Sequence, residues 1–203
     1  MKYVNQPKTE KGQETLDKII LEAERLFSEK GYYKTSIKDI TKAAEVGIGT
    51  FYIYFEDKHS LYQAILSEYG HFIRKTIAES VRTAETRLEA ERMGIETFIR
   101  LVRKRPSMYN VIWQALYVDK KLFVDYYTKF SENYIKQILI AQEKGEIIAD
   151  YDPEALSYML MGITNFIGLR YAIFDDQTDL DPILDEVMDM LVNGIYTHNE
   201  RME

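Results

Sequence analysis

The chain has 203 residues, 46% of them hydrophobic, and a formal net charge of -7. This length and apolar content predict a globular protein, either one large domain or a small domain fused to a larger one. The sequence contains no cysteine, which excludes disulfides, a thiol nucleophile and a thiolate metal site.

Two stretches bear on localisation. Residues 1–14 contain no apolar run of the kind that forms a signal peptide, and the most apolar stretch, residues 158–169, is too short and interrupted for a membrane span. We therefore expect a cytoplasmic protein with no membrane partner.

The negative charge is unevenly distributed. Residues 1–66 carry ten Lys and Arg against ten Asp and Glu, whereas residues 67–203 carry sixteen against twenty-three. The overall acidity argues against nucleic-acid binding, because contacts to phosphates need cations. A neutral N-terminal third can still bind DNA if its surface is locally polarised, and we expect modest non-specific affinity.

The chain opens with a polar segment, and residues 1–14, which include Pro7, are predicted to be a flexible, solvated tail. Thr15 is the predicted N-cap of a first helix that ends at Gly31. The apolar face of this helix consists of Leu16, Ile19, Ile20, Ala23, Leu26 and Phe27. Its predicted role is to hold the following helices at a fixed angle.

A short second helix is predicted to begin at Thr35 or Ser36. Asp39 stands three residues after Ser36, which completes a capping-box pattern. Lys38 and Lys42 fall four residues apart, on the face opposite the apolar stripe of this helix. The pattern stops after little more than two turns, at residues 45–47.

A third helix is predicted over residues 48–55, and it is unusually aromatic for a surface helix. Phe51 and Phe55 lie four apart and are expected to face inward. Thr50, Tyr52 and Tyr54 are expected on the more exposed faces, where they could dock against another molecule.

Two short helices joined by a tight turn are typical of a helix-turn-helix motif, whose second helix enters the major groove of DNA. Residues 35–58, TSIKDITKAAEVGIGTFYIYFEDK, resemble the DNA-binding head of the TetR family of bacterial transcriptional regulators. The matching positions are Thr35-Ser36, Ile40, Ala43-Ala44, Gly49-Thr50, Phe51-Tyr52, Tyr54-Phe55, Lys58 and Leu61.

The resemblance implies that residues 35–54 bind DNA. The predicted groove contacts are Thr50, Tyr52 and Tyr54. The predicted interface with the phosphates comprises Thr35, Ser36, Lys38, Gly47, Gly49 and Lys58. The alternative to DNA binding is that these residues form an ordinary pair of core helices, but such a pair would not require glycines on both sides of Ile48.

Two positions depart from the family pattern. Glu45 stands where the family has a turn glycine, which places an acidic group near the DNA-facing turn. Gly47 stands where a serine often caps the recognition helix, and this removes one expected phosphate contact. We expect affinity or operator preference to differ accordingly.

A long helix is predicted over residues 59–82, and the resemblance implies that it joins the head to the body. His59 and His71 lie on it without a third ligand at metal spacing, so both are interpreted as surface side chains and no metal site is predicted. Residues 83–92 are predicted to be a mobile connection or an exposed helical turn. The basic run at residues 100–105 is interpreted as complementing a helix dipole.

Aromatic residues gather in two further predicted helices, one starting at Pro106 and one capped by Asp119 and closed near Gly145. Tyrosine and tryptophan need hydrogen-bond partners when buried, so such a cluster can either pack a core or line a ligand cavity. The sequence favours neither. The candidate ligand contacts here are Tyr109, Trp113, Tyr117 and Tyr127.

The last two predicted helices start at Asp152-Pro153 and Asp181-Pro182. Both are apolar around much of their circumference, and the resemblance implies that they pair with their copies in a homodimer; a monomer core is the alternative. Asn165, Phe166 and Arg170 are further ligand candidates. Arg170 would either fix an acidic ligand group or pair with an acid between residues 175 and 181.

These observations predict an all-α protein with a flexible tail (1–14), a helix-turn-helix domain (15–66) and a helical ligand-binding and dimerisation domain (67–203). The expected partners are an operator in double-stranded DNA and a small apolar or aromatic ligand. We expect a transcriptional regulator of the repressor type, with no cofactor and no enzymatic activity, because no catalytic set is visible. The alternatives are a helical ligand carrier and a co-regulator that acts through protein contacts.

Overall fold

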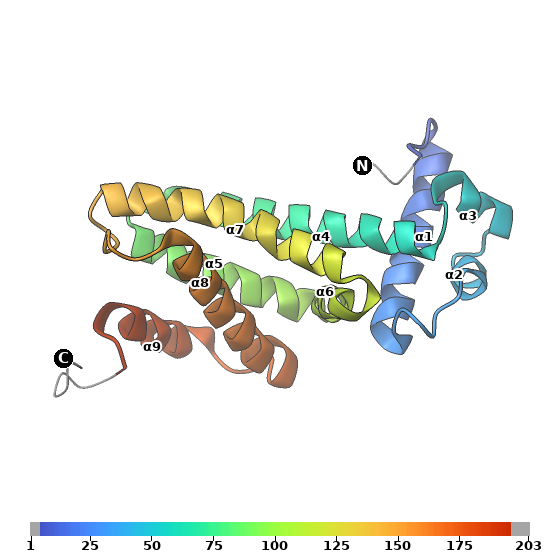
Figure 1. The fold of residues 1–203 in the computed structure, drawn as a ribbon. Coiled ribbons are helices and arrows are strands. Elements are labelled where there is room, and N and C mark those ends of the chain that lie inside the picture. The colour runs from blue at the N-terminus through green and yellow to red at the C-terminus, as the bar shows by residue number, and fades with distance from the viewer. Residues whose placement is uncertain (1–4, 196–203) are drawn as a thin grey trace. The chain divides into compact units, whose positions relative to one another are not determined.

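The computed structural model describes residues 5–195 and, within that range, consists of helices joined by short loops (Figure 1). The predicted all-α class is confirmed. The helices are α1 (Glu10–Lys30), α2 (Ile37–Ala43), α3 (Ile48–Tyr54), α4 (Lys58–Ser80), α5 (Arg87–Lys104), α6 (Pro106–Val118), α7 (Lys120–Glu143), α8 (Pro153–Gly168) and α9 (Leu180–Asn193). A 3-10 turn (Val81–Thr83) follows α4, and a π-helical turn (Leu169–Phe174) follows α8.

Two compact units divide the chain, and the boundary between them falls inside or at the end of long helices. One unit takes the residues up to Lys75 together with Lys104–Lys136, and the other takes Thr76–Arg103 together with the residues from Gln137 onward. The first unit therefore holds α1–α3 and α6. The predicted domain boundary after residue 66 stays a prediction.

The first unit is built around α1. Thr9 caps this helix by accepting a hydrogen bond from the backbone N–H of Gly12 at 3.1 Å, and Gly31 ends it at a φ of 83°. The predicted start at Thr15 is wrong, because Thr15 lies inside the helix and donates its hydroxyl to the carbonyl of Lys11. Residues 1–4 of the predicted tail lie outside the described residues.

The core of the first unit is mostly aromatic and aliphatic. Side chains from α1, α2, α3 and α4 that are almost fully buried meet there: Ile19, Phe27, Ile40, Phe51, Phe55, Leu61, Tyr62 and Ile65. The predicted inward direction of Phe51 and Phe55 is confirmed. The α6 helix packs along α1, and Pro106 opens α6 at its first turn, where a missing N–H costs nothing.

The second unit is held by long-range contacts of α5. Of the two alternatives for residues 83–92, a mobile connection or an exposed helical turn, the structure shows helix from Arg87 onward, the start of α5, where Glu91 is buried beside Arg87. Arg92 reaches Asp181 and Asp185 of α9 at 3.1 and 3.0 Å. Side-chain pairs that bridge helices far apart in sequence explain why this charged stretch is ordered.

Two caps define the last helices. Asp152 accepts from the N–H of Ala155 at 2.7 Å and confirms the predicted start of α8. The predicted cap at Asp181 is wrong by two residues, because Asp179 is the N-cap of α9 and Asp181 lies in its first turn. Arg103 fixes the π turn between these helices by donating to the carbonyls of Tyr171 and Thr178.

The end of α8 packs closely on α5 at Gly168. A Cβ at Gly168 would lie 2.9 Å from Cε1 of Phe98, closer than real Cβ contacts allow. We predict that Gly168→Ala lowers the free energy of unfolding by about 1–3 kcal/mol, because an overpacked core forces side chains out of their rotamers. Urea unfolding followed by circular dichroism measures this change.

The double variant with Phe98→Leu is the matched control. Leucine vacates the position of Cε1, so the double variant should lose less stability than the two single changes together. Strict additivity would show that the ring of Phe98 is not what Gly168 accommodates.

Candidate nucleic-acid interface and ligand site

The start of α2 is fixed by the predicted capping box. Ser36 Oγ accepts from the N–H of Asp39 at 3.1 Å, and Asp39 Oδ2 accepts from the N–H of Ser36 at 2.9 Å. The Ser36 hydroxyl also donates to this carboxylate, which holds the pKa of Asp39 below its usual value. Ser36 and Lys38 are exposed, as an interface with DNA requires.

Thr35 does not share this exposure. Its side chain is buried, and its hydroxyl donates to the carbonyl of Gly31 at 2.9 Å and to that of Leu26 at 3.2 Å. Adjacent hydroxyls at a helix start look equivalent in the sequence, but only one can be the N-cap. The expectation of a phosphate contact from the Thr35 side chain is therefore wrong.

The turn between α2 and α3 carries both departures from the family pattern. Glu45 has a φ of 55°, in the left-handed region that favours glycine. Gly47 is the N-cap of α3 and gives no side-chain cap. Both Glu45 and Gly47 are exposed, so the turn presents a carboxylate where a family member would present none.

The exposed face of α3 carries Tyr52 and Ile53. Tyr52 is 53% exposed, whereas Phe51, the residue before it, is fully buried. Gly49 is exposed and Thr50 is half-buried on the same short helix. The exposure of Tyr52 is what a groove contact requires, and the contact itself stays a prediction.

Tyr54 is the exception on α3. It is only 7% exposed, and its hydroxyl donates to the carbonyl of Gly12 on α1 at 3.0 Å. The expectation that Tyr54 faces outward is wrong, because its ring completes the packing of α3 on α1. We do not carry it into the proposed DNA contacts.

Lys58 is also engaged within the protein. Its Nζ donates to the carbonyls of Tyr32 and Thr35, both at 2.7 Å, and lies 4.1 Å from the centre of the Tyr32 ring. Partial burial lowers the pKa of Lys58. The side chain ties the first turn of α4 to the loop before α2, so a phosphate contact from its ammonium group is not supported.

Three candidate ligand residues of α6 and α7, Tyr109, Trp113 and Tyr127, belong to one aromatic cluster. Ring centres are 6.0 Å apart for Tyr109 and Trp113, 6.3 Å for Trp113 and Phe123, and 4.8 Å for Phe123 and Tyr127. Burial and the neighbouring phenol of Tyr109 raise the pKa of Tyr127 to about 12, so Tyr127 keeps its proton at neutral pH. The structure thus brings together three of the predicted residues.

The cluster extends beyond the residues predicted from the sequence. Tyr126 lies 5.2 Å from both Tyr127 and Phe130, and Arg74 of α4 stacks 5.1 Å from the Phe130 ring. Positions 123, 126, 127 and 130 are spaced three or four residues apart in one helix, and this spacing indicates that their rings lie on the same face. Arg74 had no such signal, since its partner is 56 positions away.

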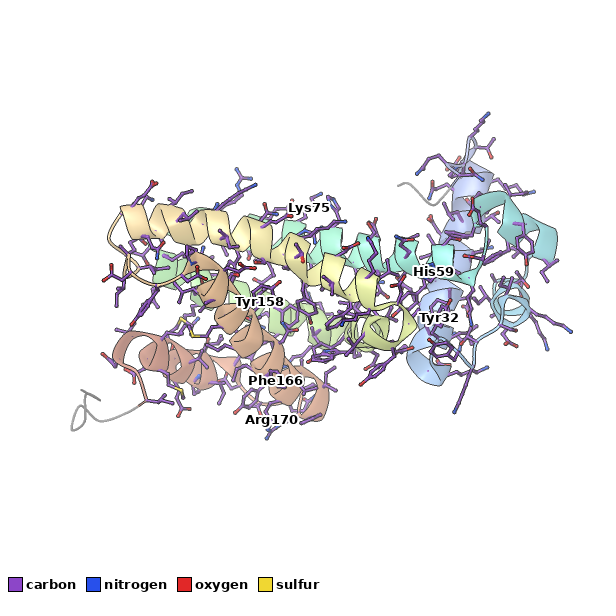
Figure 2. All side chains as sticks on the ribbon, viewed as in Figure 1. Tyr32, His59, Lys75, Tyr158, Phe166 and Arg170 are labelled. Atoms are coloured by element: carbon purple, nitrogen blue, oxygen red, sulfur yellow. The ribbon has the colours of Figure 1, made fainter. Side chains whose placement is uncertain are left out.

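Three of the four remaining ligand candidates lie at the surface, and Asn165 is half-buried. Tyr117 is 78% exposed and Phe166 is 62% exposed. Arg170 is exposed, pairs with Asp175 at 3.6 Å and stacks on Tyr171 (Figure 2). Of the two alternatives for Arg170, the structure shows the pairing with an acid. Asn165 donates its amide to the carbonyl of Met161 one turn earlier.

Histidine supplies no metal centre in the part of the chain that the structure describes. His59 Nε2 lies 3.0 Å from Asp119 Oδ2, which joins the starts of α4 and α7 (Figure 2). Across residues 5–195, no group of three His, Cys, Asp or Glu side chains could hold a metal ion. Nor is any helix in that range long and apolar enough to cross a membrane.

A capped second helix, a tight turn and a third helix with an exposed aromatic face define a helix-turn-helix DNA-binding protein. The family model described as "Bacterial regulatory proteins, tetR family" matches residues 19–65. The chain belongs to the TetR family and is a DNA-binding transcriptional regulator. The resemblance noted in the sequence is confirmed, and since the family is non-enzymatic, so is the expectation that the chain is not an enzyme.

Relatives extend the match well beyond the head. The probable HTH-type transcriptional regulator YttP of Bacillus subtilis is 25% identical over 161 residues, covering 77% of each chain. The fatty acid metabolism regulator protein of B. subtilis is 25% identical over 183 residues, covering 88% of this chain and 94% of that protein. The HTH-type transcriptional repressor DhaR of a Mycobacterium species is 24% identical over 192 residues, 86% of this chain and 90% of its own.

Solved structures share the whole fold. The fatty acid degradation regulator FadR from Bacillus halodurans superposes with a TM-score of 0.80 at 20% identity, over 95% of this chain and all of that one. FadR from B. subtilis, solved in complex with stearoyl-CoA, gives 0.73 at 20% identity, over 89% and 100%. The predicted arrangement of a helix-turn-helix head and a helical body is confirmed.

The strained turn generates a prediction for Glu45. We predict that Glu45→Gly raises the free energy of unfolding by about 1 kcal/mol, because a non-glycine residue at positive φ costs about that much. Thermal and urea unfolding of the purified protein measure it.

Glu45→Gln separates charge from strain. It keeps the unfavourable backbone conformation, so stability should stay within about 0.5 kcal/mol, yet it removes the carboxylate and should strengthen DNA binding about twofold to fivefold at low salt. Equal stabilisation by both substitutions would contradict the assignment of the strain to the backbone.

Proposed function

We propose that this protein is a cytoplasmic, homodimeric repressor that leaves a palindromic operator when its body binds an apolar small molecule. The observation that carries the proposal is the exposed face of α3, where Tyr52 and Ile53 stand out from a helix whose other aromatic side chains are buried. Relatives include a repressor, DhaR, and an activator, FasR, so activation is the nearest competing outcome.

The proposed DNA contacts follow from exposure. Thr50 and Tyr52 would touch base edges, and Ser36, Lys38 and the backbone at Gly47 and Gly49 would meet phosphates. The head is neutral overall, so binding would depend on the exposed lysines of α2. In a two-fold dimer, the α3 helices would meet successive major grooves about 34 to 36 Å apart.

A homodimer is supported by the apolar surface of α8 and α9. Large side chains that are exposed in the single chain lie on these helices: Tyr158, Met159, Phe166, Met190 and Val192. Tyr158 and Phe166 mark this surface on α8 (Figure 2). Apolar side chains on this scale are typical of a protein–protein interface. A second copy of the chain, brought by two-fold symmetry, would cover them.

The proposed ligand is a long-chain acyl-CoA or the corresponding fatty acid. The aromatic cluster of Tyr109, Trp113, Phe123 and Tyr127 supports an apolar body on the ligand. The acyl chain is proposed because the FadR structure from B. subtilis, which shares this fold, is a complex with stearoyl-CoA. Arg170 is not part of this proposal, since it is exposed and pairs with Asp175.

Ligand would act by binding one state of the body better than another. A differential affinity of about 5.5 kcal/mol shifts a two-state equilibrium from 1:99 to 99:1, and a smaller difference gives partial release. A ligand carrier and a co-regulator without DNA binding are not supported, because this family binds DNA. Steep salt dependence of DNA binding separates the proposal from both.

The groove contact generates a direct test. We predict that Tyr52→Ala lowers affinity at least tenfold for a duplex selected from a random library by the wild-type protein, because it removes an exposed phenol from the reading helix. Fluorescence anisotropy measures this affinity. Tyr151→Ala is the matched control, since Tyr151 is 54% exposed but lies far along the chain, in the loop before α8. Undiminished binding by Tyr52→Ala would contradict the proposed contact.

Ligand binding can be followed by the fluorescence of Trp113, because it is the chain's only tryptophan and belongs to the aromatic cluster. We predict that stearoyl-CoA or stearate changes Trp113 fluorescence and releases the selected duplex, whereas free CoA does neither. Native mass spectrometry should show a dimer, with the added mass of the ligand. Release without any change in Trp113 emission would place the ligand away from this cluster.

A further inference from the structure

The recognition helix is short, and its C-terminal end depends on another part of the chain. Seven residues form α3, so it has few hydrogen bonds of its own, and helices this short are marginal in isolation. The last carbonyls of any helix lack partners within it. On α3 these are the carbonyls next to Tyr52, at Ile53 and Tyr54.

Asn5 supplies partners for both carbonyls. Its side-chain Nδ2 donates to the carbonyl of Ile53 at 2.7 Å, and its backbone N–H donates to the carbonyl of Tyr54 at 3.3 Å. The residue lies five positions before α1 begins, in the polar segment that the sequence predicts to be solvated. Forty-eight positions separate Asn5 from Ile53 along the chain.

A second tie reaches the same end of α3 from its other side. The hydroxyl of Tyr54 donates to the carbonyl of Gly12, at the start of α1. The space is tight there, since a Cβ at Gly12 would lie 3.1 Å from Pro7 Cβ and 3.4 Å from the Tyr54 oxygen. Residues 5–12 therefore hold the last residue of α3 both by its carbonyl and by its side chain.

We propose that Asn5 is a positioning residue for operator recognition. It touches the residues directly after Tyr52, so the orientation of the Tyr52 and Ile53 side chains depends on where its two hydrogen bonds fix the end of α3. The bonded carbonyls face Asn5 rather than DNA, and the residue acts through α3. Being exposed itself, Asn5 contributes little to the core, and its loss should leave the fold intact.

The test uses full-length Asn5→Ala, with Gln6→Ala as the matched control, because Gln6 is an equally exposed amide next in the chain. The probes are a duplex selected from a random library by the wild-type protein and a scrambled duplex of the same composition. Asn5→Ala should bind the selected duplex about tenfold more weakly, the effect of losing one hydrogen bond in each subunit. Binding to the scrambled duplex should change less than twofold.

A readout on the free protein separates positioning from direct contact. Hydrogen–deuterium exchange of the amides at residues 51–54 should be faster in Asn5→Ala and unchanged in Gln6→Ala. Tyr54→Phe, which removes the second tie, should shift exchange and selectivity in the same direction.

Three results would overturn the inference. The first is an Asn5→Ala affinity for the selected duplex within twofold of wild type. The second is an equal loss on both duplexes with unchanged exchange, which would make Asn5 a phosphate contact. The third is a fall in melting temperature large enough to show that Asn5 supports the whole fold.

Discussion

The end of α1 is completed by a side chain from α6, and the architecture of the first unit depends on this interaction. The amide of Gln114 accepts from the N–H of Tyr32 and donates to the carbonyl of Phe27, both at 2.9 Å. Gln114 thereby gives the Tyr32 N–H a partner and adds a second donor to the carbonyl of Phe27, which also accepts from the N–H of Gly31 at 3.0 Å. Three residues before Gln114, the carbonyl of Val111 accepts from the buried hydroxyl of Tyr62. Hydrogen bonds and a shared core therefore join α6 to both α1 and α4.

The same loop after α1 also receives the start of α4. Lys58 binds the carbonyls of Tyr32 and Thr35, and its neighbour His59 contacts Asp119 at the start of α7. Thus α4, α6 and α7 all make polar contacts close to the segment that leads into α2. A change at Trp113 on α6 has a short physical route to this segment, since Gln114 is the next residue. These contacts form a continuous physical connection through which the proposed ligand would act on the segment before α2.

Local chemistry made most elements predictable, and long-range contacts account for the errors. Ser36 with Asp39, Asp152 before Pro153, and Gly31 each act within a few residues, so their caps could be read from the sequence. Tyr52 and Tyr54 are both phenols on a helix of two turns. The buried Tyr54 donates its hydroxyl to the carbonyl of Gly12, 42 residues away on α1, and no periodicity within α3 indicates this contact.

The candidate site shows the same division. Helical spacing places Tyr109 and Trp113 together because both belong to one helix, whereas only composition associates Phe166 and Arg170 with a cavity. Lysine beside a recognition helix is ordinarily read as a phosphate contact. The carbonyls that hold Lys58 lie 26 and 23 residues earlier and could not be inferred from its neighbours.

The recognition helix combines several unfavourable local features, and their sum explains why it relies on distant contacts. It follows a residue at positive φ, begins without a side-chain cap and has seven residues. Burial of the Phe51 and Tyr54 rings anchors its inner face, but packing alone leaves the carbonyls at the helix end without partners. The contacts at Ile53 and Tyr54 supply these partners. Segments of low intrinsic stability are the ones whose populations shift most easily, so a helix built this way can bind DNA in one state of the protein and lose its register in another.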